Sequence, residues 1–112
     1  IIKMEYIIVF CTTDNKENAE LIAHTLVKEK LAACTNIIPQ INSIYTWKEQ
    51  IVQDEELLLL IKTRKELFEE VKNRILSLHN YEVPEIISVN LNDGSKSYLD
   101  WIKENTTKKD CL

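Results

Sequence analysis

Continuous apolar stretches alternate along the chain with stretches in which apolar residues recur every three or four positions. Residues 5–13 are a continuous apolar and β-branched run, which predicts a strand covered on both faces. Asp14 and Glu17 then have the spacing of a helix start, and the apolar stripe that follows predicts a helix ending near Lys30. The chain is therefore expected to open with a strand and an amphipathic helix.

The middle of the chain predicts two long strands joined by a short turn. Residues 32–47 are rich in Ile, Thr, Tyr and Trp, and Pro39 predicts a bulge or an edge position there because proline removes a ladder hydrogen bond. After a polar turn at residues 48–50, residues 51–63 form a second strand, polar in its first half and apolar in its second. This contrast predicts one end exposed to solvent and one end buried.

The last third of the chain repeats the order of helix and strand. Thr63 and Glu66 predict a second helix start, and an apolar stripe extends this helix to near His79. Residues 85–92 alternate as a strand with one solvated face, and a short helix opens at Ser97. The order β-α-β-β-α-β plus a terminal helix predicts an α+β, ferredoxin-like fold, in which helices cover one face of an antiparallel sheet.

Composition narrows the classes of function. We expect one domain over residues 1–112, with residues 1–3 and 105–112 peripheral, because a chain of 112 residues has room for a single core. The 14 basic and 18 acidic residues give a formal net charge of −4, which argues against nucleic acid as a partner.

The apolar runs and the cysteines indicate the compartment. No apolar run approaches the roughly twenty residues of a membrane span, so we expect no membrane partner. Three cysteines without a CxxC spacing favour free thiols, and therefore a cytoplasmic protein.

The two central strands are too long for a domain of this size. A compact domain of this length has a radius of gyration near 13 Å and spans roughly 35 Å, whereas residues 32–47 extend about 50 Å as a strand. The far half of the hairpin, with Tyr45 and Trp47, is expected to project. Because unpaired edges are usually covered, we expect other copies of the chain to pair with it in a closed homo-oligomer. The alternative is a corner at Pro39 that divides the segment into two short strands.

Several ordered motifs, spread from about residue 6 to residue 102, resemble one protein family. They are VFCT at 9–12, KLAACTNIIP at 30–39, SIYTW at 43–47, the strand at 55–63 and YEVPEI at 81–86. In this order they resemble the divalent-cation tolerance protein CutA family. The resemblance implies a ferredoxin-like subunit in a PII-like homotrimer held together by long hairpins. It also implies a non-enzymatic role in tolerance to divalent metal ions, with copper as the usual ligand.

Cys11 and His79 are the candidate metal ligands. The family associates the position of Cys11 with metal, and both thiolate and imidazole suit copper. The first and last strands of this fold are antiparallel neighbours, so the end of the first strand meets the start of the last at one edge of the sheet. Cys11 and His79 are therefore expected to come together there. The alternatives are a small buried hydrophobe at Cys11 and a helix-terminal residue at His79.

Two positions depart from the family pattern. Glu49 stands in the hairpin turn where family members often carry glycine, and Leu78 stands where the metal-associated pattern can show a histidine beside His79. The first departure predicts a different local turn, and the second predicts weak copper binding.

The sequence lacks the motifs of the enzyme classes that this fold would suggest. The single glycine, Gly94, excludes a glycine-rich phosphate loop, and neither Arg64 nor Arg74 lies in the loop after the first strand, where an acylphosphatase-like site would need one. Together with the free thiols, the family resemblance implies a cytosolic homotrimer that takes part in divalent-metal tolerance and binds copper weakly. The alternative is a PII-like signalling or scaffold trimer that binds a small molecule or a partner protein in its inter-subunit clefts.

Overall fold

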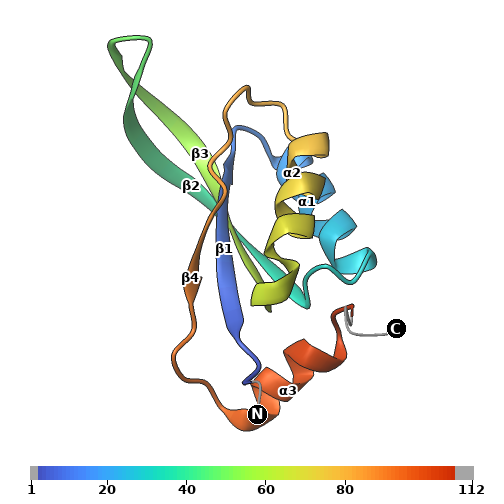
Figure 1. Ribbon diagram of the computed structural model, residues 1–112. Helices are drawn as coiled ribbons and strands as arrows, with labels where there is room; N and C mark the ends of the chain where they lie inside the picture. The colour runs from blue at the N-terminus through green and yellow to red at the C-terminus, as the bar shows by residue number, and fades with distance from the viewer. Residues whose placement is uncertain (1–2, 108–112) are drawn as a thin grey trace.

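The computed structural model describes residues 3–107, which form a four-stranded antiparallel sheet with its helices (Figure 1). The elements are β1 (Tyr6–Thr13), α1 (Lys16–Lys28), β2 (Cys34–Trp47), β3 (Gln50–Arg64), the 3-10 turn η1 (Lys65–Leu67), α2 (Phe68–Leu78), β4 (Ile87–Asn90) and α3 (Lys96–Glu104). The strand order is β2-β3-β1-β4, and every neighbouring pair is antiparallel. The predicted α+β, ferredoxin-like architecture with a terminal helix is confirmed.

The core lies between the sheet and the helices α1 and α2, which cover one face of it (Figure 1). Successive residues of a strand point to opposite faces, so Val9 and Cys11 share the covered face, where both are fully buried with Leu26 of α1. The helix α3 lies at the end of the sheet away from the hairpin tip, where Ile102 packs with Tyr6. None of the described helices is long and apolar enough to cross a membrane.

Two predicted helix starts are displaced by one or two residues. Asn15, and not Asp14, is the N-cap of α1, because the Oδ1 atom of Asn15 accepts a hydrogen bond from the backbone N–H of Asn18 at 2.7 Å. Ser95, and not Ser97, caps α3 in the same way. In both cases the observed cap is another polar residue, one or two positions before or after the predicted one.

The second helix starts later than the Thr63 signal predicted. The hydroxyl of Thr63 donates to the backbone carbonyl of Leu31 at 2.7 Å and does not cap the helix. A 3-10 turn then precedes α2, which begins at Phe68. A contact between distant parts of the chain has replaced the local capping interaction.

The last strand, β4, is shorter and more exposed than predicted. It covers four residues of the expected 85–92. The side chains of Ile87 and Val89 were expected on a buried face, but they are 56% and 45% exposed. They lie opposite Phe10 and Ile8 of β1, on the face of the sheet that neither α1 nor α2 covers. The subunit therefore leaves an apolar sheet face uncovered.

The hairpin of β2 and β3 projects beyond the rest of the sheet (Figure 1). The described chain measures 49 × 26 × 23 Å and has a radius of gyration of 15.0 Å, larger than the roughly 13 Å of a compact domain. Near the tip Ile51 is 83% exposed, whereas β3 becomes largely buried from Glu56 onward. The predicted projection and the predicted contrast along this strand are confirmed.

Pro39 lies at a bulge and not at a corner. The register between β2 and β3 shifts between Ile38 and Ile41, where Gln40 has a φ of 60°. Pairing resumes at once and continues to the turn, so the segment is one bulged strand. The alternative of two separate short strands is wrong.

Two left-handed residues form the hairpin turn. Lys48 and Glu49 have φ angles of 50° and 66°, as a two-residue turn requires, but each carries a Cβ atom that disfavours this conformation. Replacing Glu49 with glycine is therefore expected to raise the free energy of unfolding by about 1 kcal/mol, measured by urea denaturation. Glu55→Gly, in extended strand backbone, is the control and is expected to destabilise. A lower stability for Glu49→Gly would contradict a strained turn.

Candidate functional site

Cys11 lies inside the core. Its side chain is fully buried between the sheet and the helices, and its Sγ atom lies 3.8 Å from the backbone carbonyl of Thr12. Burial raises the pKa of the Cys11 thiol to about 12, and the nearby carboxylates of Glu85 and Glu56 add to this rise. Metals bind the thiolate, so this environment opposes the form of cysteine that acts as a ligand.

His79 is the C-cap of α2, and its imidazole connects two segments. The Nε2 atom donates to the backbone carbonyl of Thr12 at 2.7 Å, and the Nδ1 atom accepts from the backbone N–H of Tyr81 at 3.1 Å. Because an amide N–H only donates, this geometry fixes the tautomer with its proton on Nε2. Both ring nitrogens are therefore occupied by the protein itself.

The structure brings His79 to the residue beside Cys11, at the sheet edge where topology predicted it. The two side chains do not present free ligands there, because the thiol is buried and protonated and the imidazole has no free nitrogen. Among residues 3–107 no group of three or more His, Cys, Asp or Glu side chains is placed to hold a metal ion. As folded, the pair does not fit an open copper site.

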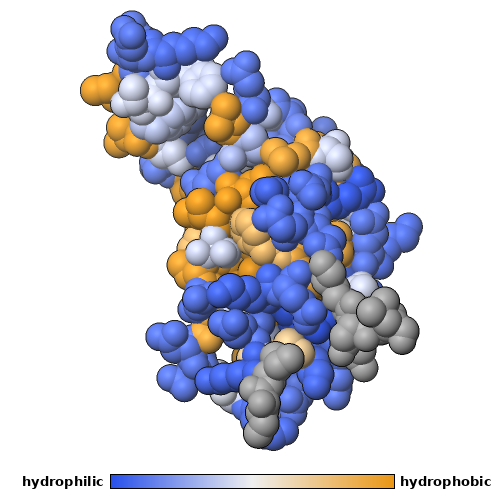
Figure 2. Space-filling model, in the orientation of Figure 1, coloured by the Kyte–Doolittle hydropathy of each residue, from blue (hydrophilic) through white to orange (hydrophobic). Residues whose placement is uncertain are grey.

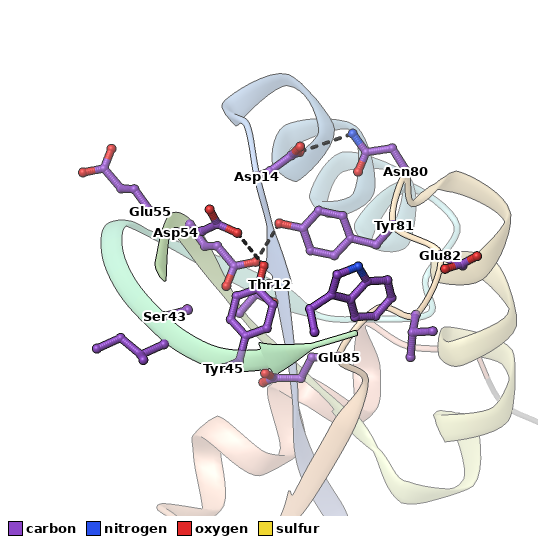
Figure 3. Close-up of a pocket in the computed structure, with 14 residues that line it drawn as sticks. Thr12, Asp14, Ser43, Tyr45, Asp54, Glu55, Asn80, Tyr81, Glu82 and Glu85 are labelled. Carbon is purple, nitrogen blue, oxygen red and sulfur yellow. Dashed lines mark hydrogen bonds between the residues drawn. The ribbon is translucent and has the colours of Figure 1, made fainter. Parts of the chain in front are cut away.

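An open cleft lies between the hairpin and the loop that joins α2 to β4 (Figure 3). Its volume is about 820 Å³. It is lined by Thr12, Asp14, Ser43, Ile44, Tyr45, Trp47, Asp54, Glu55, Glu56, Asn80, Tyr81, Glu82, Val83 and Glu85. Four separate segments of the chain therefore contribute to one concave surface.

Two hydrogen bonds between a tyrosine and a carboxylate connect segments that line the cleft. The hydroxyl of Tyr81 donates to Glu56 Oε2 at 2.6 Å, and the hydroxyl of Tyr45 donates to Asp54 (Figure 3). The pKa of Tyr81 is raised, first by burial and then by its hydrogen bond to Glu56, so the phenol stays a donor. The pairs join the loop to β3 and join the two strands of the hairpin.

Sequence reasoning missed this cleft. It treated the polar half of β3 as a solvated strand end and had no means of placing residues 80–85 over it. The available signal was the density of carboxylates, at 54–56 and again between 82 and 85, next to aromatic residues in both segments. Only the packing of the loop against the hairpin makes them one surface.

The family model of the CutA1 divalent ion tolerance protein matches residues 7–105. The chain belongs to this family. It is 48% identical over 99 residues to the divalent-cation tolerance protein CutA of Thermus thermophilus, covering 88% of this chain and 96% of that protein. It is 43% identical over 100 residues to the chloroplastic CutA of Arabidopsis thaliana, and there it spans only 55% of the plant protein.

Solved structures of CutA proteins have the same fold as this subunit. The protein from Thermus thermophilus superposes with a TM-score of 0.89 at 46% identity, covering 91% of this chain and 99% of that one. CutA1 from Oryza sativa superposes with a TM-score of 0.90 at 39% identity, covering 93% and 95%. As a member of the CutA1 family, the chain is a divalent-cation tolerance protein and not an enzyme.

Proposed function

We propose that this CutA1 family member works in divalent-metal tolerance as a homotrimer assembled through its β2–β3 hairpin. The observation that carries the proposal is the hairpin that leaves its own subunit, together with the uncovered sheet face of Ile87 and Val89. Figure 2 shows hydrophobic side chains at the surface across the middle of the subunit. Such edges and patches are normally covered in a stable protein.

A closed ring is the assembly that this geometry favours. A hairpin that reaches from one copy to the next makes a head-to-tail contact, and head-to-tail contacts close into rings when the rotation allows it. The number three rests on the PII-like architecture that the family resemblance implies.

Two substitutions on opposite sides of the sheet test the assembly. Val89→Lys is expected to convert the trimer to monomers, because it places a charge on the uncovered face, whereas Leu21→Lys on α1 is expected to leave the trimer intact. The two side chains are similarly exposed in the subunit, 45% and 49%, so neither change disturbs its core. Light scattering at micromolar concentration gives the mass. A monomeric parent protein, or a trimeric Val89→Lys variant, would contradict the proposed interface.

We also propose that copper binds weakly through Cys11 and His79, only after the pair leaves the folded arrangement described above, in which it does not fit a copper site. A thiolate and an imidazole suit copper, and His79 contacts the residue next to Cys11. Binding requires Cys11 to lose its proton and His79 to give up one of two hydrogen bonds, and both requirements lower the affinity.

The cytosol is the compartment that we propose. The free thiols of Cys11 and Cys34 support a reducing compartment. Relatives are described as chloroplastic in Arabidopsis thaliana and periplasmic in Archaeoglobus fulgidus, so location varies within the family. Cell fractionation with an antibody to the protein tests this point.

Ligand binding is a second candidate function, in the manner of a PII-like signalling trimer. The observation that favours it is the cleft of about 820 Å³ between the projecting hairpin and the loop that joins α2 to β4, whose size is that of a small-molecule site.

A further inference from the structure

The guanidinium of Arg64 is buried with one of its nitrogen atoms unpartnered. The side chain is 2% exposed, and its Nη2 atom has no hydrogen-bond partner among the described residues. The other two nitrogens are used, Nε by the hydroxyl of Thr106 and Nη1 by the carboxylate of Glu66. A buried donor without an acceptor costs free energy, above all on a charged group, so the free Nη2 indicates an acceptor that this site takes up in another state.

This site is closed by the subunit itself. Arg64 lies opposite Tyr6 in the sheet, so both side chains are on the face that α1 and α2 leave uncovered. At this end of that face α3 covers them. Ile102 of α3 packs with Tyr6, and Thr106, which follows α3, is 4% exposed. The surroundings of the guanidinium are therefore complete without a neighbouring subunit, at the pole opposite the hairpin tip (Figure 1).

A methionine sulfur lies beside the guanidinium. The Sδ atom of Met4 is 3.8 Å from Nη1 of Arg64, and the Met4 side chain is only partly buried at the edge of the small core around Tyr6. A thioether is a weak acceptor, but oxidation converts it to a polar sulfoxide. An oxygen bonded to this sulfur reaches the roughly 2.7–3.2 Å that a hydrogen bond from a guanidinium nitrogen requires. Because methionine has three rotatable side-chain bonds, the oxygen can turn toward Nη1 and Nη2.

We propose that Met4 is a site of reversible oxidation, at which the sulfoxide oxygen accepts the hydrogen bond that the Arg64 guanidinium lacks. Hydrogen peroxide supplies the oxygen: an S–O bond forms from a lone pair of the sulfur, the O–O bond breaks, the sulfur loses two electrons, and the peroxide is reduced to water. A sulfoxide usually disrupts a core because its oxygen finds no donor. Here the charged donor is already in place, so the oxidised protein is the more stable form. The proposal is independent of the trimer and of copper binding.

Met4 is the only methionine of the chain, so its oxidation can be followed directly. Protein treated with hydrogen peroxide, and then with dithiothreitol to reduce oxidised thiols, is expected to keep the added mass of one oxygen atom, which peptide mass spectrometry locates at Met4. In urea denaturation at one fixed protein concentration its midpoint is expected to rise by about 0.5 M. Methionine sulfoxide reductases are expected to restore the original midpoint. Light scattering checks that the mass of the assembly is the same before and after oxidation.

Glutamine and leucine at position 4 test the same contact without an oxidant. Glutamine carries an amide oxygen that accepts a hydrogen bond, whereas leucine keeps an apolar side chain without an acceptor. The Met4→Gln variant is therefore expected to have a higher urea midpoint than the Met4→Leu variant. With Arg64→Leu added to both, the order is expected to reverse, because the amide oxygen then has no charged donor. Circular dichroism checks that each variant is folded.

Several results would overturn the proposal. One is a folded protein in which Met4 gains no oxygen under conditions that oxidise free methionine. Another is a lower midpoint for the oxidised protein, or for Met4→Gln than for Met4→Leu, since the oxygen would then have found no donor. An equal advantage of glutamine in the Arg64→Leu background would place the effect away from the guanidinium. If the Arg64→Leu variants do not fold, the comparison of Met4→Gln with Met4→Leu in the parent protein still decides.

Discussion

Replacing Arg64 with alanine is expected to lower the free energy of unfolding by about 3 kcal/mol. This side chain is 2% exposed at the end of β3. Its Nε atom donates to the hydroxyl of Thr106 at 2.9 Å, and its Nη1 atom pairs with the carboxylate of Glu66 and lies 3.8 Å from the sulfur of Met4. The substitution removes all these contacts and leaves a cavity. Urea denaturation at one fixed protein concentration measures the loss, since the stability of an oligomer depends on concentration.

The only other arginine of the chain is the matched control. Arg74 forms an exposed pair with Glu29, so Arg74→Ala is expected to cost much less stability than Arg64→Ala. Arg64→Met keeps most of the buried volume without the charge and is expected to lose less than Arg64→Ala. Equal effects of the Arg64→Ala and Arg74→Ala changes would contradict the role assigned to the buried guanidinium.

Replacing His79 with alanine is expected to cost about 2 kcal/mol, because it leaves a backbone carbonyl of Thr12 and a backbone N–H of Tyr81 without their partner. The ladder between β1 and β4 ends at Phe10 and Ile87, two residues before Thr12. His79 therefore holds the end of β1 where β4 no longer pairs with it. The same denaturation experiment measures the change.

His24, the only other histidine, is exposed on α1, and His24→Ala is expected to change stability by less than about 0.5 kcal/mol. The pair of variants also tests copper. If His79 and Cys11 hold copper, calorimetric titration with copper shows a weaker affinity in His79→Ala and in Cys11→Ser, but not in His24→Ala. An affinity unchanged in all three variants would contradict this site.

Periodicity in the sequence predicted the order of the strands and α-helices, because it depends on the apolar positions that form the core. It failed at element ends, where contacts between distant segments decide. The hydroxyl of Thr63 bonds to Leu31 and not to its own helix, and no local pattern contains that partner. The alternation of Ile87 and Val89 predicted a buried face, which is wrong for the subunit, because neither α1 nor α2 covers that side of the sheet.

In the candidate site too, the sequence predicts the position of a residue but not its contacts. Topology alone placed His79 at the end of β1, because strand order follows from connectivity. The state of its two ring nitrogens depends on a carbonyl of β1 and an amide of the loop, which only the folded backbone positions. The protonation of Cys11 likewise depends on how completely helices cover the sheet.

The contacts of Arg64 have a practical consequence for handling the protein. Met4 and Thr106, near the two ends of the described chain, both touch this one side chain, at the pole opposite the hairpin tip (Figure 1). A dye or a tether to a solid support can be attached at this pole, close to Met4 or Thr106. The β2–β3 hairpin at the far pole then remains unobstructed, and the mixing of differently labelled subunits tests the proposed assembly without a label on the hairpin.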